Sequence, residues 1–424
     1  MHRRFRLTAS LSSAALIATA PLAAQTVPAT NATVRRTLDR IKADNAWTLD
    51  QQQSICGIPA PPFKETVRGA EYKRRLEALG LTVRIDSIGN VIAERRGTGS
   101  GPTVMIAGHL DTVFPEGTDV KVKRDGTKMA GPGIGDDCRG LAVVLSVARA
   151  FQMEKLATTG TVIFVGNVGE EGPGNLRGVR HLFDREYKGK IDYFISVDGT
   201  GLDIASRAVG SYRYRVTYKG PGGHSYGAFG IPNPIHALGR AISAISDIQV
   251  PTTPKTTFNV GIIQGGTSVN SISGDASMEV DMRSEDAASL AAVDAKVQKI
   301  LRDALAAENA RWTGPRAATA KLTLVVDTMG IRPTGGQADS ARIVQAAISA
   351  GKLLGFTATT GASSTDANIP ISLGVPGIRL GGGGKGDGAH SLGETYDDGQ
   401  NGWLGPQWAL LLVTALAGIH QVQP

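Results

Sequence analysis

The segment from Thr161 to Gly172, TVIFVGNVGEEG, constrains the fold more than any other part of the chain. Its first half is a short run of β-branched and aromatic residues, which predicts a strand buried on both faces of a sheet. Its second half places two adjacent carboxylates, Glu170 and Glu171, directly after that strand. Neighbouring like charges in such a place repel each other unless a positive charge lies between them. The segment is therefore either a solvated acidic turn or part of a cation site, and other motifs must decide between the two.

Other predicted strands also deliver acidic or histidine side chains just beyond their ends. These strands and the residues that follow them are 103–107 with His109 and Asp111, 191–197 with Asp198, and 377–380 with a glycine-rich loop that carries His390. In open α/β sheets, ligands bind outside the carboxyl ends of the strands, so this repeated placement predicts one shared crevice. The fold class expected for the main part of the chain is α/β, with a central, mostly parallel sheet flanked by helices.

The two histidines of this set have alternative interpretations. Alone, His109 at a strand end is more often a packed residue than a ligand. His109-X-Asp111 differs, because the aspartate can accept the proton of the second imidazole nitrogen and turn the ring toward a metal. The glycine-rich loop around His390 can reflect flexibility alone, or a backbone that must approach a substrate closely.

A second glycine-rich loop, KMAGPGIGDDCRG, runs from Lys128 to Gly140 and leads into a helix with one apolar face. It does not match a phosphate-binding loop, because no Lys-Ser/Thr pair follows its glycines and no G-x-G-x-x-G pattern fits. Its two acids, Asp136 and Asp137, either cap the helix that follows or include a residue that bridges cations. The sequence leaves both interpretations open.

Composition bounds the size and the compartment. The chain has 424 residues, of which 41% are hydrophobic and 20% charged, so it can bury a full core and is expected to form two domains. Residues 1–24 combine three arginines near the start, a run of small apolar residues and a final Pro-Leu-Ala-Ala. This pattern predicts a cleavable secretory signal rather than a membrane anchor, and hence an exported, periplasmic or secreted protein.

Charge and cysteine content exclude two kinds of site. The formal charge is +7, and without the three leader arginines it would be +4, which is mild. Since no run of Lys and Arg is interleaved with aromatics, nucleic-acid binding is not expected. The two cysteines, Cys56 and Cys138, do not form a CxxC pair, so any metal must be held by histidines and carboxylates. Whether they form a disulfide cannot be read from the sequence.

The middle of the chain changes character and predicts an inserted α+β domain. Strand-like alternation and helix-like spacing follow one another in the order β-α-β-β-α-β, at 212–218, 235–245, 257–263, 276–282, 290–301 and 322–326. The expected organisation is a signal at 1–24, a main domain at 25–206 and 328–424, and an inserted lid or dimerisation domain at 207–327.

Taken together, the ordered motifs resemble the M20 family of two-metal peptidases and deacylases. The motifs are His109-X-Asp111, Asp136-Asp137, Glu170-Glu171, Asp198 and His390, and the resemblance covers essentially the whole chain after the signal. GHLDTVFPEG is similar to the glutamate carboxypeptidase branch, whereas GIGDDCRGLA and the IPAPPF loop are similar to the tripeptidase branch. Cys138 stands where the family often has a lysine.

The resemblance implies a site with two divalent ions. The ligand set carried over is His109 and Asp198 for one ion, Glu171 and His390 for the other, and Asp136 as the bridge. Glu170 would be the general base, which takes a proton from the attacking water and passes it to the leaving amine, and Asp111 would orient His109. Zinc is the expected metal, with cobalt or manganese as alternatives, because His and carboxylate ligands suit all three.

Three residues of the inserted domain also match the family. His224 in GPGGHSYG resembles a lid histidine that supports the developing oxyanion, often from the partner subunit of a dimer, so a homodimer through this domain is implied. Asn270 in GGTSVNSIS and Arg283 in VDMRS resemble residues that grip a substrate carboxylate. The structural alternatives are a histidine in a glycine turn, a loop asparagine and a solvated strand-end arginine.

The function expected from the sequence is an exported metal-dependent exopeptidase. It would hydrolyse an amide bond in a small peptide or aminoacyl substrate that carries a free carboxylate. An N-acyl amino acid deacylase of the same family is the nearest alternative, and a metal- or peptide-binding protein without catalytic activity is a third. Glu170 favours an enzyme over the third alternative, because a pure binder has no use for a base beside the metals.

Overall fold

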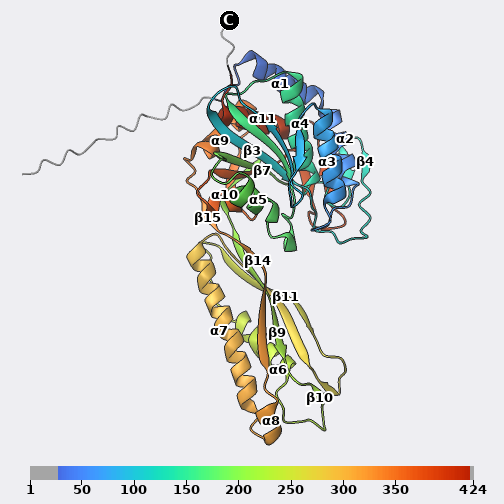
Figure 1. Ribbon diagram of the computed structural model, residues 1–424, viewed down its shortest axis with the longest axis vertical. Coiled ribbons are helices and arrows are strands. Elements are labelled where there is room, and N and C mark those ends of the chain that lie inside the picture. Colours follow the sequence, from blue (N-terminus) through green and yellow to red (C-terminus); the bar gives the residue numbers. More distant parts are fainter. Residues whose placement is uncertain (1–26, 421–424) are drawn as a thin grey trace, which may run out of the picture.

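The computed structural model describes residues 27–420, so the predicted signal at 1–24 lies outside the described residues. Two lobes are visible in Figure 1: a broad main lobe and a long, narrow lobe that extends away from it. The narrow lobe, called the inserted lobe below, is formed by residues 210–332. None of the helices within the described range has the length and apolar character needed to cross a bilayer.

The main lobe is built around one mixed sheet. Its strands are β1 Val83–Ile85, β2 Val91–Arg95, β3 Gly101–His109, β6 Gly160–Asn167, β7 Tyr193–Val197, β8 Asp203–Ala208, β15 Gly335–Gly336, β16 Thr359–Ser363 and β17 Gly377–Leu380. They are ordered β1-β2-β6-β3-β7-β17-β8-β15, with β16 paired to β8. The four central strands, β6, β3, β7 and β17, are mutually parallel, which confirms the expected α/β class.

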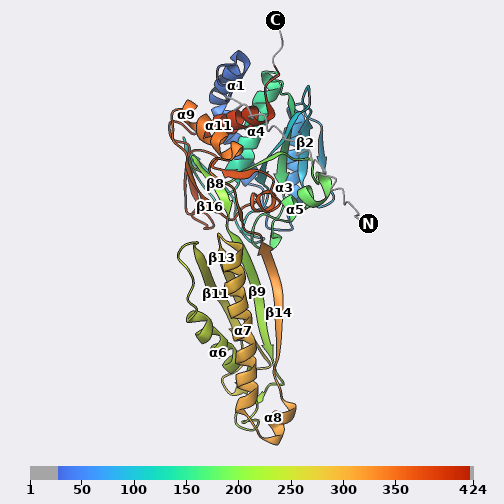
Figure 2. The same ribbon diagram turned by 90° about the vertical axis from the view of Figure 1, so that its left-hand side faces the viewer.

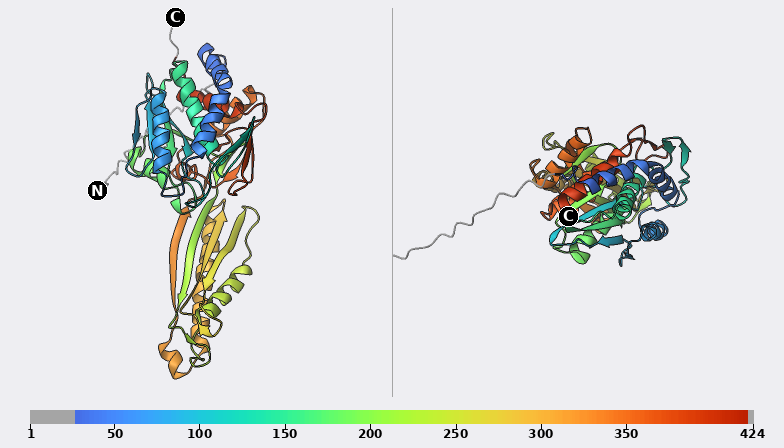
Figure 3. Two further views of the ribbon diagram at one scale, coloured as in Figure 1. Left: turned by 90° about the vertical axis from the view of Figure 1, so that its right-hand side faces the viewer. Right: turned by 90° about the horizontal axis from the view of Figure 1, so that it is seen from above.

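Helices pack around this sheet (Figures 1 and 3). The α-helices of the main lobe are α1 Ala32–Ala43, α2 Asn45–Cys56, α3 Thr66–Ala78, α4 Cys138–Met153, α5 Arg177–His181, α9 Arg342–Leu353, α10 Asn368–Ser372 and α11 Leu404–Ala417, and two short turns of other helix types lie at Gly172–Gly174 and Leu182–Glu186. Successive β3 residues belong to different cores: Val104 packs with α4 and α11, and Met105 packs with α5. The central strands are therefore buried on both faces, as their apolar sequences predict.

A small antiparallel sheet flanks the main lobe. Its strands are β18 Lys385–Asp387, β19 Thr395–Asp397, β5 Lys128–Ala130 and β4 Lys123–Asp125, in that order. The sheet joins the two glycine-rich loops, because β5 leads into the loop that carries Asp136 and β18 leads into the loop that carries His390. Two segments about 260 residues apart are thereby brought together.

The inserted lobe is a four-stranded antiparallel sheet with two helices along one face (Figure 2). The strand order is β11 Thr256–Gly265, β13 Asp275–Ser284, β9 Gly210–Lys219 and β14 Thr323–Arg332, and the helices are α6 Pro234–Ser246 and α7 Ala287–Arg311, with β10 Gly223–His224, β12 Ser271–Ile272 and α8 Pro315–Thr319 near the tip. Alternate residues of β13 are buried against α6 and α7, which explains the period-two pattern in its sequence. β14 runs to Arg332, five residues beyond the boundary expected at 327.

Candidate metal centre

The polar residues expected at the strand ends lie at one edge of the main sheet. His109 is the last residue of β3, Glu170 and Glu171 follow β6, and Asp198 follows β7. Because β6, β3 and β7 are adjacent and parallel, their carboxyl ends open on the same side. His390 arrives from the loop after β18, where its backbone has a positive φ of 65°.

Asp136 lies between two histidines that come from distant parts of the chain. His109 Nε2 is 3.0 Å from Asp136 Oδ1, and His390 Nε2 is 3.0 Å from Asp136 Oδ2. Each carboxylate oxygen thus faces a different imidazole. This is the arrangement expected of a carboxylate that bridges two cations.

At this edge of the sheet the donor atoms form three overlapping sets of three, two of which contain Asp136. Sets whose donor atoms all lie within 4.8 Å of one another are His109 with Asp136 and Asp198, Asp136 with Glu171 and His390, and His109 with Glu170 and Glu171. Glu171 Oε1 is buried and lies 3.2 Å from His390 Nε2, yet it makes no well-oriented hydrogen bond. A buried carboxylate oxygen without a donor is costly, and a cation at this place would satisfy it. The residues therefore fit divalent ions held by nitrogen and oxygen donors.

Asp111 orients the neighbouring residues in a different way from the one expected. The Nδ1 of His109 lies 3.0 Å from the backbone oxygen of Asp111 but 3.8 Å from its carboxylate. That carboxylate instead accepts the backbone N–H groups of Glu170, at 3.1 Å, and Glu171, at 2.8 Å. The backbone carbonyl can thus hold the proton on Nδ1 and leave Nε2 free, while the side chain fixes the Glu170-Glu171 turn.

The adjacent Asp137 has the capping role that was one of its two interpretations. Its side chain accepts the N–H of Gly140, at 2.9 Å, as the N-cap of α4, and also the N–H of His109, at 2.9 Å. The peptide between Asp136 and Asp137 is cis. The two aspartates therefore have different roles, since Asp137 ties helix α4 to strand β3 whereas Asp136 faces the histidines.

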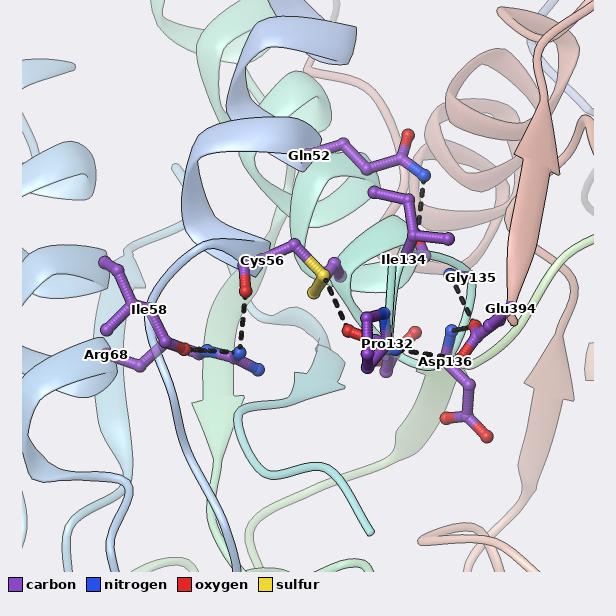
Figure 4. The surroundings of a disulfide bond; sticks show 12 residues. Gln52, Cys56, Ile58, Arg68, Pro132, Ile134, Gly135, Asp136 and Glu394 are labelled. Atoms are coloured by element: carbon purple, nitrogen blue, oxygen red, sulfur yellow. Dashed lines mark hydrogen bonds between the residues drawn. A yellow bond between two sulfur atoms is a disulfide. The ribbon is translucent and has the colours of Figure 1, made fainter. Parts of the chain in front are cut away.

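Two anchors hold the loop that carries Asp136 (Figure 4). The buried carboxylate of Glu394 accepts three backbone N–H groups of this loop, from Gly133, Gly135 and Asp136, at 2.7–2.9 Å. On the other side, Cys56 at the end of α2 forms a disulfide with Cys138. The disulfide answers the question that the sequence left open, and both anchors restrict the position of Asp136.

The charges of the cluster influence one another strongly. The hydrogen bond to Asp136 and the nearby carboxylate of Glu171 raise the pKa of His390 to about 10. Burial and the nearby carboxylates raise the pKa of Glu171 to about 7 and that of Asp198 to about 6. Burial lowers the pKa of His109, but the surrounding aspartates outweigh burial and raise it well above its usual value. Without cations, protons must therefore take up the excess negative charge of this cluster.

The structure does not bring His224 and Asn270 to the cluster within one chain. His224 belongs to β10, which lies at the end of the inserted lobe farthest from the main lobe (Figure 1). Asn270 lies beside it, since its carbonyl accepts the N–H of Ser225 at 2.9 Å. Arg283 lies at the opposite end of the lobe, near the main lobe, where it lines a pocket of about 320 Å³ with Lys255 and Ser364.

Sequence reasoning missed two residues that hold the centre in place. Arg332 donates from Nη1 to Glu170 Oε1 at 2.9 Å, and Glu394 anchors the Asp136 loop. Glu394 follows His390 by four residues. Its position near an expected metal ligand could have indicated that it supports the site. Arg332 had no local signal, because its contact with Glu170 spans 162 residues and depends on how the inserted lobe returns to the main lobe.

The four central strands of this mixed sheet are parallel, and histidines and carboxylates at their ends gather around a shared aspartate. Together with the long inserted lobe, this arrangement is that of a class of metal-dependent hydrolases. The chain belongs to peptidase family M20/M25/M40, which it matches over residues 105–401. It is therefore a metal-dependent hydrolase of this family, a peptidase or a deacylase.

Individual relatives are distant. The chain is 31% identical to the succinyl-diaminopimelate desuccinylase of Nitrosospira multiformis over 251 residues, which cover 54% of this chain and 65% of that enzyme. The structure of aminopeptidase PepT from Bacillus cereus superposes with a TM-score of 0.68 at 20% identity, over 90% of this chain and 99% of that one. The structure of YXEP of Bacillus subtilis, a dinuclear metal-binding peptidase of the M20 family, superposes with a TM-score of 0.64 at 19% identity. The match covers 88% of this chain and 99% of that one. The structural likenesses show a shared fold.

Proposed function

We propose that this protein is a two-metal exopeptidase that hydrolyses an amide bond in small peptides or aminoacyl substrates with a free carboxylate. The observation that carries the proposal is the position of Asp136, whose two oxygens face His109 and His390 separately. A carboxylate placed in this way can serve two ions at once, and two ions suit an attack by water on an amide carbonyl.

The proposed ligand set is the one that the family resemblance implied. His109 and Asp198 would hold one ion, Glu171 and His390 the other, and Asp136 both. When bound, the ions would polarise the scissile carbonyl and make water a stronger nucleophile. Zinc is the proposed metal, and cobalt or manganese would suit the same donors.

Glu170 is the proposed general base. It belongs to neither of the two donor sets that contain Asp136, and its backbone N–H is fixed by the Asp111 carboxylate at 3.1 Å. A carboxylate that is not required as a ligand can take the proton of the attacking water and deliver it to the leaving amine. The adjacent Glu171 could not act as the general base while it holds a metal.

Arg283 is the proposed anchor for the free carboxylate of the substrate. It lines the pocket at the junction of the two lobes, and Ser364 of the same pocket accepts a hydrogen bond from Arg332, which contacts Glu170. A planar guanidinium matches a carboxylate in shape and charge. A substrate held there would be close to the proposed base.

His224 and Asn270 are proposed to act on the site of a second subunit. They lie at the tip of the inserted lobe, away from the cluster of their own chain. In a symmetric dimer the same surface serves both subunits, so each lobe tip can complete the partner's site. A homodimer through the inserted lobe is therefore part of the proposal.

The test is a substrate panel assayed with metal-reconstituted protein. The panel contains dipeptides, tripeptides, N-acyl amino acids and folate-type glutamates, and hydrolysis of peptides or glutamyl amides is the expected result. Glu170→Gln should keep two metals per chain and lose about 10²- to 10⁴-fold in turnover. Turnover close to normal in this variant would remove Glu170 as the base.

A deacylase is the second candidate, since the desuccinylase of Nitrosospira multiformis is 31% identical in the matched region. Release of acetate or succinate from N-acylated amino acids, without peptide hydrolysis, would establish it. Stoichiometric metal binding with no turnover on any substrate class would favour the binding protein instead.

We also propose that the protein is exported, on the basis of the residue pattern at 1–24. The disulfide between Cys56 and Cys138 supports this location, because such bonds persist in oxidising compartments. Detection of the processed chain in a periplasmic or culture fraction would test it, and an unprocessed chain in the cytoplasm would contradict it.

A further inference from the structure

The last strand of the inserted lobe ends in contact with the main-lobe segment that carries Glu170. β14 pairs with β9 from Thr323 to Arg332, with a bulge between Thr328 and Gly330, so it is part of the sheet of the inserted lobe. Its final residues, Ile331 and Arg332, also bind residues 170–180 of the main lobe. One strand therefore connects the lobe to the proposed base without an intervening loop.

Arg332 holds Glu170 at two points. Its Nη1 donates to the Glu170 carboxylate at 2.9 Å, and its Nη2 donates to the Glu170 backbone oxygen. Arg332 is 4% exposed and Glu170 is 5% exposed, so solvent screens this ion pair little. Among the described residues, no other hydrogen bond reaches the Glu170 carboxylate. The guanidinium thus fixes both where this carboxylate lies and which way it points.

The neighbouring residue Ile331 adds two further links. Its N–H donates to Asn175 Oδ1 at 3.1 Å, and its carbonyl accepts a hydrogen bond from Arg180. Asn175 has a φ of 51°, a left-handed conformation that asparagine tolerates well. The strand end is therefore bonded to the turn after Glu171 as well as to Glu170 itself.

We propose that Arg332 is a positioning residue for Glu170, and that the end of β14 couples the orientation of this base to the position of the inserted lobe. The inference rests on the proposed function, in which Glu170 must reach the attacking water. A lobe movement that shifts the end of β14 shifts the guanidinium, and hence the carboxylate bound to it. Misplacement of a catalytic group by 1 Å can cost about 10²-fold in rate.

The test compares Arg332→Met and Arg332→Lys with the wild-type enzyme. Met should lower kcat by about 10²-fold with KM changed less than about threefold and two metals retained, and Lys should recover part of the loss. A higher KM with normal kcat would overturn the proposal, because Arg332 would then bind substrate. Loss of metal would also overturn it, because the role would then be structural.

A double-mutant cycle with Glu170→Gln separates this inference from the proposed function. If Arg332 acts through Glu170, adding Arg332→Met to Glu170→Gln should cause no further loss of kcat. If the two residues act independently, the fold-losses of the two single variants should multiply in the double variant. If Glu170→Gln itself stays active, the proposed base fails. If Glu170→Gln is inactive but Arg332→Met stays active, the proposed base stands and the positioning role of Arg332 fails.

Asn175→Gly provides a second, milder variant if Arg332→Met does not fold. Glycine keeps the left-handed backbone and removes the acceptor of the Ile331 N–H. We expect kcat to fall about three- to tenfold with unchanged metal content. Unchanged kcat would contradict the coupling. Arg149→Met, which breaks the 2.8 Å ion pair with Asp44 on the outside of α4, is the matched control and should leave kcat unchanged.

Discussion

Removal of the Cys56–Cys138 disulfide should destabilise the main lobe by about 4.5 kcal/mol. The two cysteines are separated by 82 residues, and closing a loop of this length removes conformational entropy from the unfolded chain, worth about 4.5 kcal/mol at 25 °C in the chain-entropy description. Both side chains are fully buried. The bridge joins the end of α2 to the start of α4, so its loss should also loosen the loop that carries Asp136.

Urea unfolding of metal-free protein measures this quantity, because bound metal would add its own stabilisation. The background variant is Trp312→Phe, which removes the tryptophan of the inserted lobe and leaves those at 47, 403 and 408 to report on the main lobe. Two comparisons are needed. The first compares reduced with oxidised protein, which have the same side-chain heavy atoms. The second compares the double variant Cys56→Ala, Cys138→Ala with the oxidised protein, and here a small cavity lowers the free energy of unfolding further.

The reduced protein should lose about 4.5 kcal/mol, and the double alanine variant slightly more. A loss below about 1 kcal/mol in both comparisons would refute the reasoning, because the unfolded chain would then gain little freedom when the bridge opens.

Three further predictions concern the metal centre. Since the pKa of His390 is raised to about 10, its imidazole is protonated at pH 8 and must lose that proton to bind a metal. Metal affinity should therefore rise with pH. Because the buffer takes up the released proton, the calorimetric heat of metal binding should depend on the ionisation enthalpy of the buffer. A heat of binding that is the same in all buffers would contradict this prediction. Glu394→Gln should weaken metal binding by about 10- to 100-fold, measured by competition with a chelator, because an amide cannot accept all three loop N–H groups. Mixing inactive Glu170→Gln with inactive His224→Ala should restore up to about a quarter of wild-type activity if His224 acts across a dimer, and no recovery would place its role elsewhere.

Much of the centre could be predicted because the information is local to each strand end. A short apolar run predicts a buried strand, and a polar residue after it must lie at the edge of the sheet. The α/β class and the convergence of His109, Glu171 and Asp198 follow from this reasoning. The β-α-β-β-α-β order of the inserted segment also appears in the structure, because its strands alternate with period two and α7 keeps apolar residues three and four apart.

The remaining features depend on contacts between distant segments, which spacing does not encode. The sequence could not distinguish the roles of Asp136 and Asp137, because capping and metal binding favour the same residue at the same place. The role of Asp111 differed from expectation because its backbone oxygen, rather than its carboxylate, lies nearest the His109 ring. The pairing of Arg332 with Glu170 required the inserted lobe to return to the main lobe at one particular point.

The most direct test of the two-ion centre is anomalous diffraction at the zinc edge from crystals grown with zinc. The account predicts two strong peaks per chain, one among His109, Asp136 and Asp198 and the other among Asp136, Glu171 and His390. A single peak, or peaks that leave Asp136 uncoordinated, would contradict it.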